Sequence, residues 1–182
     1  MRILVSAASR HGGTAEVAHA IATALARAGI DVDEQRPEIV GHLNAYDGVV
    51  LGSAVYAGHW LKPAKDLVER TSAQMRARPV WLFSTGPVGF PLKPEGSPVD
   101  VAPMLEQSGG LEHRIFGGRL DKGELGFGEK VLVQMTGATE GDYRSWDDIE
   151  AWATHIASTL KAGTTTALPD DPQDDSPAHR SA

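Results

Sequence analysis

The segment Ile3–Ala18, ILVSAASRHGGTAEVA, decides the fold of this chain, because it joins an apolar run to a helix through a short glycine-bearing loop. The run Ile3–Val5 is typical of a strand that is buried on both faces of a parallel sheet. The small residues of Ser6–Gly13 leave backbone N–H groups able to surround an anion, and Thr14 is predicted to open a helix whose dipole favours negative charge there. The segment therefore predicts a strand, a phosphate-binding loop and a helix in succession.

The predicted helix after this loop is amphipathic. Apolar residues recur at intervals of three and four, which places one face of the helix against a sheet. Gly29 is expected to end it, because glycine is the usual residue just beyond a helix C-terminus. The apolar positions are Ala18, Ile21, Ala22 and Leu25.

The loop departs from the two commonest phosphate-binding patterns, since it has neither G-x-G-x-x-G spacing nor a terminal G-K-[ST]. It resembles the flavodoxin pattern [ST]-x-T-G-x-T, which Ser9, Gly12 and Thr14 match. His11 stands where that family usually has threonine, and its ring N–H replaces a hydroxyl donor. Arg10 adds a cation beside the loop. The alternative is an ordinary strand–turn–helix connection that binds no phosphate.

Composition bounds the chemistry. With 182 residues and 41% hydrophobic residues, the chain is expected to form a single domain. The formal net charge is −7, and no basic patch with interleaved aromatic residues occurs, so nucleic acid is not an expected partner. Cysteine is absent, which excludes disulfides, thiolate nucleophiles and iron–sulfur ligation by cysteine. Any electron transfer therefore requires a bound cofactor. No metal site is expected.

The two ends of the chain have different compositions. A domain is expected over residues 1–162, followed by an acidic, proline-rich and disordered tail over residues 163–182. The chain begins directly with a predicted strand, without the features of a secretory signal, and no run of eighteen apolar residues occurs. A soluble, cytoplasmic protein is expected.

Strand and helix patterns alternate along the chain, which predicts a doubly wound, five-stranded parallel α/β sheet with helices on both faces. Gly117 and Gly118 are expected to cause either a bulge or an interruption in the last strand. Helices are expected from Thr14, from about Pro63, over Ser97–Gln107, and after a capping box at Ser145 and Asp148. Strands are expected at Ile3–Val5, Ile30–Arg36, Gly48–Ser53, Val80–Ser84 and His113–Leu120.

Three predicted loops follow the carboxyl ends of strands, where open parallel sheets bind ligands. They are Ser9–Thr14, Ala54–Trp60 and Thr85–Phe90. This is the three-loop arrangement of flavodoxins, in which the first loop holds the FMN phosphate and the others flank the isoalloxazine ring.

Within that superfamily, residues 2–161 resemble the menaquinone-dependent protoporphyrinogen IX dehydrogenases of haem biosynthesis. The resemblance is carried by several short stretches in order. They are Ser9-Arg10-x-Gly12-x-Thr14, Tyr46-Asp47-x-Val49-Val50-x-Gly52, Gly58-His59-Trp60, Lys93-Pro94-Glu95 and the aromatic Trp146.

The resemblance implies an FMN-dependent oxidoreductase and a set of site residues. His59 is the candidate catalytic residue, as a hydrogen-bond donor or proton shuttle near the ring edge, with a solvated loop histidine as the alternative. Tyr56 and Trp60 are candidates to pack on the flavin ring, with a core position as the alternative. Gly58 would turn its carbonyl toward the flavin N5, with a plain turn as the alternative. The cofactor-binding candidates are Ser9, Arg10, His11, Gly12, Gly13, Thr14, Ala54, Tyr56, Gly58, Trp60, Thr85 and Gly86.

Departures from that family bear on substrate and partners. His11 replaces an acidic residue, Tyr56 replaces a basic one, and the Thr85–Pro91 loop is slightly longer. The inserted segment Asp121–Arg144 is less basic than its counterpart, which is implicated at the membrane, so membrane association is left open. The expected partners are a small-molecule substrate such as a porphyrinogen and a quinone or another redox partner.

Two other functions fit the pattern. One is a flavodoxin-type electron carrier that has no organic substrate of its own. The other is a flavin-free module of the same fold, such as a phosphoacceptor receiver, against which the absence of an acidic pair after Val5 counts.

Overall fold

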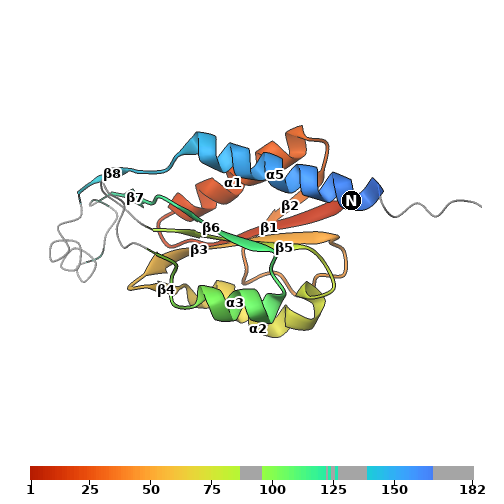
Figure 1. Cartoon of the computed structure of the whole chain (residues 1–182). Helices are drawn as coiled ribbons and strands as arrows, with labels where there is room; N and C mark the ends of the chain where they lie inside the picture. Colours follow the sequence, from red (N-terminus) through yellow and green to blue (C-terminus); the bar gives the residue numbers. More distant parts are fainter. Residues whose placement is uncertain (87–95, 122, 124–125, 127–138, 166–182) are drawn as a thin grey trace, which may run out of the picture.

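The computed structural model describes residues 1–86, 96–121, 123, 126 and 139–165, with the side chains of 164 and 165 left aside. A parallel sheet forms its centre (Figure 1). The sheet has five parallel strands, as the alternating pattern predicts, and they run in the order β2-β1-β3-β5-β6. Their bounds are β1 Arg2–Ala8, β2 Asp31–Gln35, β3 Gly48–Tyr56, β5 Val80–Thr85 and β6 Glu112–Phe116.

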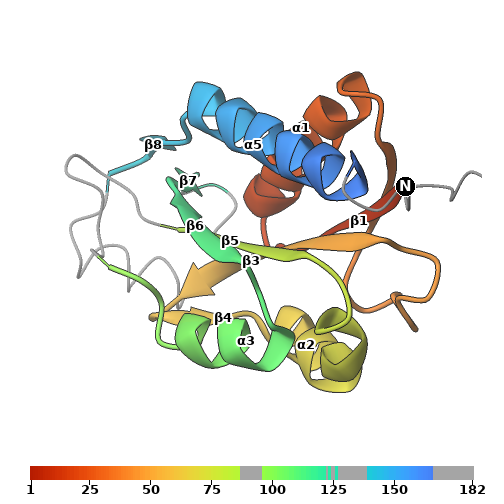
Figure 2. The same ribbon diagram turned by 45° about the vertical axis from the view of Figure 1, so that its right-hand side comes forward.

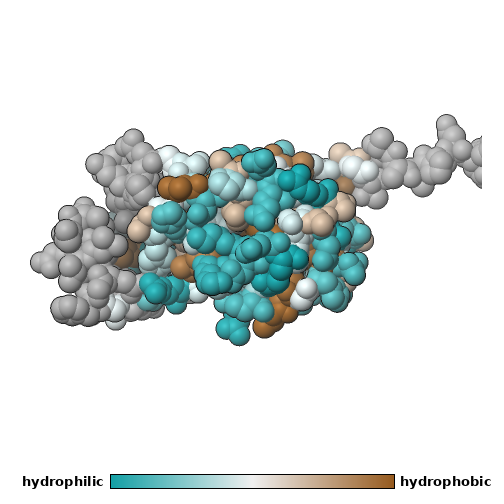
Figure 3. All heavy atoms as spheres, turned by 90° about the horizontal axis from the view of Figure 1, so that it is seen from below, coloured by the Kyte–Doolittle hydropathy of each residue, from teal (hydrophilic) through white to brown (hydrophobic). Residues whose placement is uncertain are grey.

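Helices cover both faces of this sheet (Figures 1 and 2). Helices α1 (Gly13–Arg27) and α5 (Trp146–Thr165) lie on one face, and α2 (Lys62–Met75) and α3 (Val101–Ser108) lie on the other. The outer surface beneath α2 and α3 is mostly hydrophilic (Figure 3). Among the described residues, no helix combines the length and apolar character that crossing a bilayer requires.

The core has two halves, one on each side of the sheet. Because successive side chains of a strand point to opposite faces, Ile3 and Val5 contribute to the half under α1 and α5, and Leu4 to the half over α2. In the centre of the sheet, Gly52 lies opposite Phe83. A Cβ at Gly52 would come within 2.1 Å of that ring, so only glycine fits there.

The second predicted loop, Ala54–Trp60, is mostly strand. Strand β3 continues through Tyr56, and β4 (His59–Trp60) folds back to pair with it in an antiparallel hairpin whose tip is Ala57 and Gly58. Both tip residues have positive φ, at 50° and 82°. The expectation of an irregular loop is therefore corrected to a tight hairpin, with Ala54 buried inside β3.

The predicted interruption at Gly117 and Gly118 is confirmed. Strand β6 ends at Phe116, and β7 (Arg119–Leu120) pairs instead with β8 (Gly141–Asp142) in a separate two-stranded sheet. A Cβ at Gly117 would lie 2.0 Å from the carbonyl oxygen of Tyr143, so glycine allows the chain after β8 to approach this closely. We call the paired segments β7 and β8 the distal hairpin.

Two helix bounds differ from the sequence expectation. Helix α3 begins at Val101 rather than at Ser97, and α5 continues through Thr165, past the expected start of the tail at Gly163. Residues 166–182 of that tail lie outside the described residues. The expected cap of α5 is present, because the amide of Asp148 donates to the hydroxyl of Ser145 over 3.4 Å.

Candidate cofactor-binding site

The candidate site lies where the strand order reverses. The chain leaves the carboxyl ends of β1 and β3 in opposite directions across the sheet, and such a switch point is where parallel sheets bind ligands. The first loop follows β1, the β3–β4 hairpin tip follows β3, and Gly86 follows β5. Residues 87–90 of the third predicted loop, and Lys93-Pro94-Glu95, lie outside the described residues.

The first loop ends in a helix N-terminus. Gly12 is the N-cap of α1 with φ 79°, a left-handed conformation that suits glycine, and its carbonyl accepts the amide of Glu16 at 2.9 Å. In any α-helix the first four amides have no acceptor within the helix. Here these are the amides of Gly12, Gly13, Thr14 and Ala15, which gives the loop the donors and the dipole that an anion requires.

A buried hydroxyl pair joins the first loop to the third. The Oγ1 atoms of Thr14 and Thr85 lie 2.7 Å apart, and both residues are buried. Both threonines are among the site residues expected from the sequence, and they are in contact in the structure.

Ser9 carries the observation that best tests a ligand at this loop. Its Oγ atom is buried, yet among the described residues it has no hydrogen-bond partner. A buried hydroxyl left unpaired costs about 1–3 kcal/mol. The other such hydroxyl belongs to Ser6, inside β1. A phosphate group fits here, because its oxygens accept from a serine hydroxyl and from helix amides.

The first loop also contacts the end of β3. The guanidinium carbon of Arg10 lies 5.2 Å from the centre of the Tyr56 ring, and the His11 ring centre lies 6.5 Å from it. Arg10 is exposed, and Tyr56 is partly buried. These three predicted site residues therefore form one group.

The side chain of Trp60 lies in the core, which corrects the expectation that it flanks a flavin. Its side chain is only 2% exposed and packs in the core half over α2. Its indole N–H donates to the hydroxyl of Ser84 at 2.7 Å, and that hydroxyl lies 2.8 Å from Nε2 of His113. Burial lowers the pKa of His113 to about 4. Trp60 is thus a core residue, which is the alternative position that the sequence left open.

His59 is held by a carboxylate. Its side chain is 54% exposed, and its Nδ1 atom lies 3.3 Å from a carboxylate oxygen of Asp100. Burial raises the pKa of Asp100. Hydrogen bonds from the backbone amide of Trp60 and from the His59 ring, together with the charge of Lys65, outweigh this effect and hold the pKa below its ordinary value. The pair orients the imidazole beside the hairpin tip.

The carbonyl of Gly58 is already engaged within the protein. It accepts the amide of Val99 at 2.9 Å. This bond uses one of the two lone pairs of the carbonyl oxygen, so the expected turn of this carbonyl toward the flavin N5 stays a prediction. Gly58 still serves the hairpin, because its φ of 82° suits glycine.

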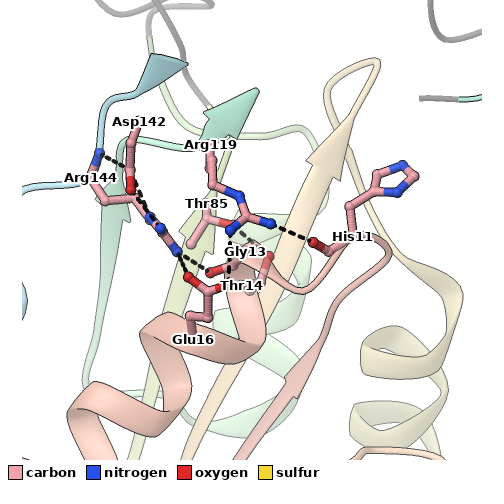
Figure 4. Close-up of polar contacts among 8 residues, drawn as sticks. All are labelled: His11, Gly13, Thr14, Glu16, Thr85, Arg119, Asp142 and Arg144. Carbon is pink, nitrogen blue, oxygen red and sulfur yellow. Dashed lines mark hydrogen bonds and ion pairs between the residues drawn. The ribbon is translucent and has the colours of Figure 1, made fainter. Parts of the chain in front are cut away.

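Two arginines that the sequence did not single out hold the first loop (Figure 4). Arg119 of β7 donates to the carbonyl of His11 at 3.3 Å, and Arg144, just after β8, donates to the carbonyl of Gly13 at 3.1 Å. Both also pair with the carboxylate of Glu16, at 3.0 and 2.7 Å.

Arg144 is anchored further by Asp142. Its Nη2 atom lies 2.6 Å from a carboxylate oxygen of Asp142, and its side chain is 3% exposed. This bond lowers the pKa of Asp142 and raises that of Arg144, so both stay charged. The arginines lie more than 100 residues beyond their partners in the loop, so no local pattern in the sequence marks them.

The fold defines a doubly wound α/β protein of the flavodoxin type, and the candidate ligand site lies at the switch point between β1 and β3. The chain belongs to the flavodoxin domain family, whose model matches residues 4–147. Flavodoxin-domain homologues bind FMN, and family membership assigns this cofactor to the chain.

Solved structures share this fold at low sequence identity. A flavodoxin from the domain Archaea is 15% identical with a TM-score of 0.63, over 88% of this chain and 99% of that one. Oxidised flavodoxin 2 from Bacillus cereus is 20% identical with a TM-score of 0.60, over 88% of this chain and 99% of that one. The flavodiiron core of Flv1 from Synechocystis is 16% identical with a TM-score of 0.62, over 90% of this chain but only 36% of that one. The comparison with curated proteins gives no significant match.

Proposed function

We propose that this chain is an FMN-dependent oxidoreductase of the protoporphyrinogen dehydrogenase type, which holds the phosphate of FMN in the first loop. The observation that carries the FMN assignment to this loop is the buried hydroxyl of Ser9, beside the N-terminus of α1, which has no hydrogen-bond partner in the described part of the chain. Ser9 and the amides of Gly12, Gly13 and Thr14 would hold the phosphate, and Arg10 and His11 would lie beside it. When bound, FMN supplies the two-electron redox chemistry that a chain without cysteine lacks.

The residues beside the flavin ring are proposed from the ends of β3 and β5. Tyr56 is the aromatic candidate, because it is partly exposed and contacts the first loop through Arg10. Thr85 is the last residue of β5, Gly86 follows it, and β5 lies on the side of β3 opposite to β1. Thr85 also ties that side to the first loop through Thr14.

His59 is the proposed proton donor and acceptor for an organic substrate. Because its Nδ1 atom faces Asp100, its Nε2 atom is the one available to exchange a proton. Such a residue is useful to a dehydrogenase, which removes protons together with electrons. A porphyrinogen as reductant and a quinone as acceptor are proposed from the sequence resemblance to the dehydrogenase family.

A second candidate function is a flavodoxin-type electron carrier. The observation that favours it is that this chain matches the archaeal flavodoxin over 99% of that protein's length. A carrier needs the phosphate loop and the ring contacts but neither a substrate pocket nor His59.

The test is an absorbance spectrum of the full chain with FMN, followed by turnover with protoporphyrinogen and a menaquinone analogue. The proposal expects bound flavin and turnover, with a lower kcat in His59→Gln and an unchanged affinity for FMN. Bound flavin without turnover of porphyrinogen by the wild-type chain supports the carrier. A protein that takes up no FMN rules out both functions and favours a flavin-free module.

A further inference from the structure

The first loop is held from outside by its carbonyl oxygens. Arg119 bonds the carbonyl of His11 and Arg144 bonds that of Gly13, and Figure 4 shows both guanidinium groups on the side of the loop away from the His11 ring. In a trans peptide the C=O and the following N–H point in opposite directions. Holding these two carbonyls therefore aims the amides of Gly12 and Thr14 away from the arginines.

The same two amides belong to the first turn of α1, whose N–H groups have no acceptor within the helix. We infer that Arg119 and Arg144 are positioning residues for the FMN phosphate, which act by fixing the peptide planes of the first loop and not by touching the phosphate. This inference rests on the proposed binding of FMN.

The charges of the network support an effect through geometry. Both guanidinium groups pair with Glu16, and Arg144 also pairs with Asp142, so two carboxylates balance two cations. The arginines therefore add little net attraction for a dianion. Arg10, which is exposed and lies over Tyr56, is the cation of the first loop itself.

The geometry of the bonds requires arginine. Arg144 donates at once to Gly13, Glu16 and Asp142, using three nitrogens of its planar guanidinium. The single ammonium of lysine does not reproduce this fork. We therefore expect that lysine at either position does not maintain the affinity for FMN.

The test compares the affinities of the full-length, flavin-free chain for FMN and for riboflavin, measured by flavin fluorescence. Riboflavin lacks the phosphate, so it separates the loop from the rest of the site. Arg119→Gln and Arg144→Gln are each expected to weaken FMN binding roughly tenfold, as the loss of a hydrogen bond from a charged group does, and to leave riboflavin binding unchanged. Arg119→Lys and Arg144→Lys are expected to behave like the glutamine variants.

Arg27→Gln is the matched control. Arg27 lies in the last turn of α1 and pairs with Glu150 of α5 at 3.8 Å. The substitution therefore removes an arginine ion pair at the far end of the same helix. It is expected to change neither affinity. Arg119 is 27% exposed and Arg144 is 3% exposed, so Arg119→Gln carries the test if the Arg144 variants do not fold.

Three outcomes overturn the inference while the wild-type chain still binds FMN. If the wild-type chain binds FMN and the arginine variants bind it equally well, the inference fails and the proposed function stands. If the variants lose riboflavin and FMN to the same extent, the arginines support the fold and not the phosphate loop. If the loss of FMN affinity disappears at high salt, the arginines act by attraction of charge. A wild-type chain that binds neither flavin overturns the proposed function and this inference together.

Discussion

The side chains of Thr14 and Thr85 meet in a buried hydrogen bond, with their Oγ1 atoms 2.7 Å apart, although 71 residues separate them in the chain. Thr14 belongs to the first turn of α1, and Thr85 is the last residue of β5. The bond thus joins two of the three segments that surround the proposed cofactor site, and it does so with no charged group.

Removing one of these hydroxyls leaves the other buried and unpaired. Thr14→Val and Thr85→Val are therefore each expected to lower the free energy of unfolding by about 1–2 kcal/mol. The double variant is expected to cost less than the sum of the two, because no unpaired hydroxyl remains. Urea unfolding of the flavin-free chain measures all three, and strict additivity would show that the two hydroxyls are not coupled.

Gly12 is required by its backbone conformation. A Cβ at this position would meet only a carboxylate oxygen of Glu16, at 3.9 Å, so space is not the obstacle, whereas the φ of 79° is strained for any other residue. Gly12→Ala is expected to cost about 1–2 kcal/mol of stability and to weaken FMN binding. Gly13→Ala is the control, because its Cβ would make an ordinary contact of 3.7 Å with Arg119. Equal losses of stability would refute the conformational explanation.

Trp60 and Tyr56 are expected to respond differently to substitution. Trp60→Phe removes the indole N–H bonded to Ser84 and is expected to lower the free energy of unfolding by about 1 kcal/mol, with no change in FMN affinity. Tyr56→Ala is expected to weaken FMN binding roughly fivefold, through loss of aromatic contact. Fluorescence titration and urea unfolding measure the two quantities. Loss of FMN affinity in Trp60→Phe at unchanged stability would return this tryptophan to the cofactor site.

His113 is expected to make stability depend on pH. Its pKa is about 4 in the folded chain, because partial burial disfavours the charged ring, and 6.5 in the unfolded chain. Between these values the unfolded chain binds a proton that the folded chain does not, so the free energy of unfolding falls as pH decreases from about 6.5 to about 4. The full effect is about 2 kcal/mol once the partial exposure of the ring is taken into account.

Urea unfolding at pH 7 and pH 4.5 measures this effect, and His113→Gln is expected to reduce the difference between the two. His19, which is 72% exposed, supplies the control variant His19→Gln, for which the difference is expected to stay as in the wild-type chain. A wild-type difference that His113→Gln leaves intact would assign the pH dependence to other groups.

Local patterns were sufficient to predict the fold and the first loop. The apolar run of β1, the glycine at the N-cap and the apolar face of α1 all lie within one short segment, and each element agrees with the next. The doubly wound arrangement, which the alternation of strands and helices predicts, is confirmed by the strand order.

The environment of Trp60 depends on strand register, which the sequence did not reveal. Trp60 pairs with Val55 in the β3–β4 hairpin, and a shift by one residue would turn its ring to the opposite side. The local sequence did not predict this hairpin, because an aromatic residue two positions after a glycine is compatible with both a loop and a strand.

Arg119 and Arg144 could not be predicted because their partners are remote in sequence. Their position depends on the distal hairpin, whose strands are only two residues long and carry no clear alternation. The glycines at 117 and 118 marked the place where β6 stops, but not which side chains would then reach the first loop.

The close approach of Gly117 to Tyr143 determines whether the first loop can be transferred to another protein. The loop is a short, continuous segment of sequence. Two of its carbonyls, however, accept hydrogen bonds from Arg119 and Arg144, and the distal hairpin can take this position only because residue 117 is a glycine. Grafting residues 9–14 onto another parallel sheet would transfer the sequence of the loop without the two arginines that orient its peptide groups. A designer who wants this loop to behave as it does here must transplant the glycine and the hairpin with it.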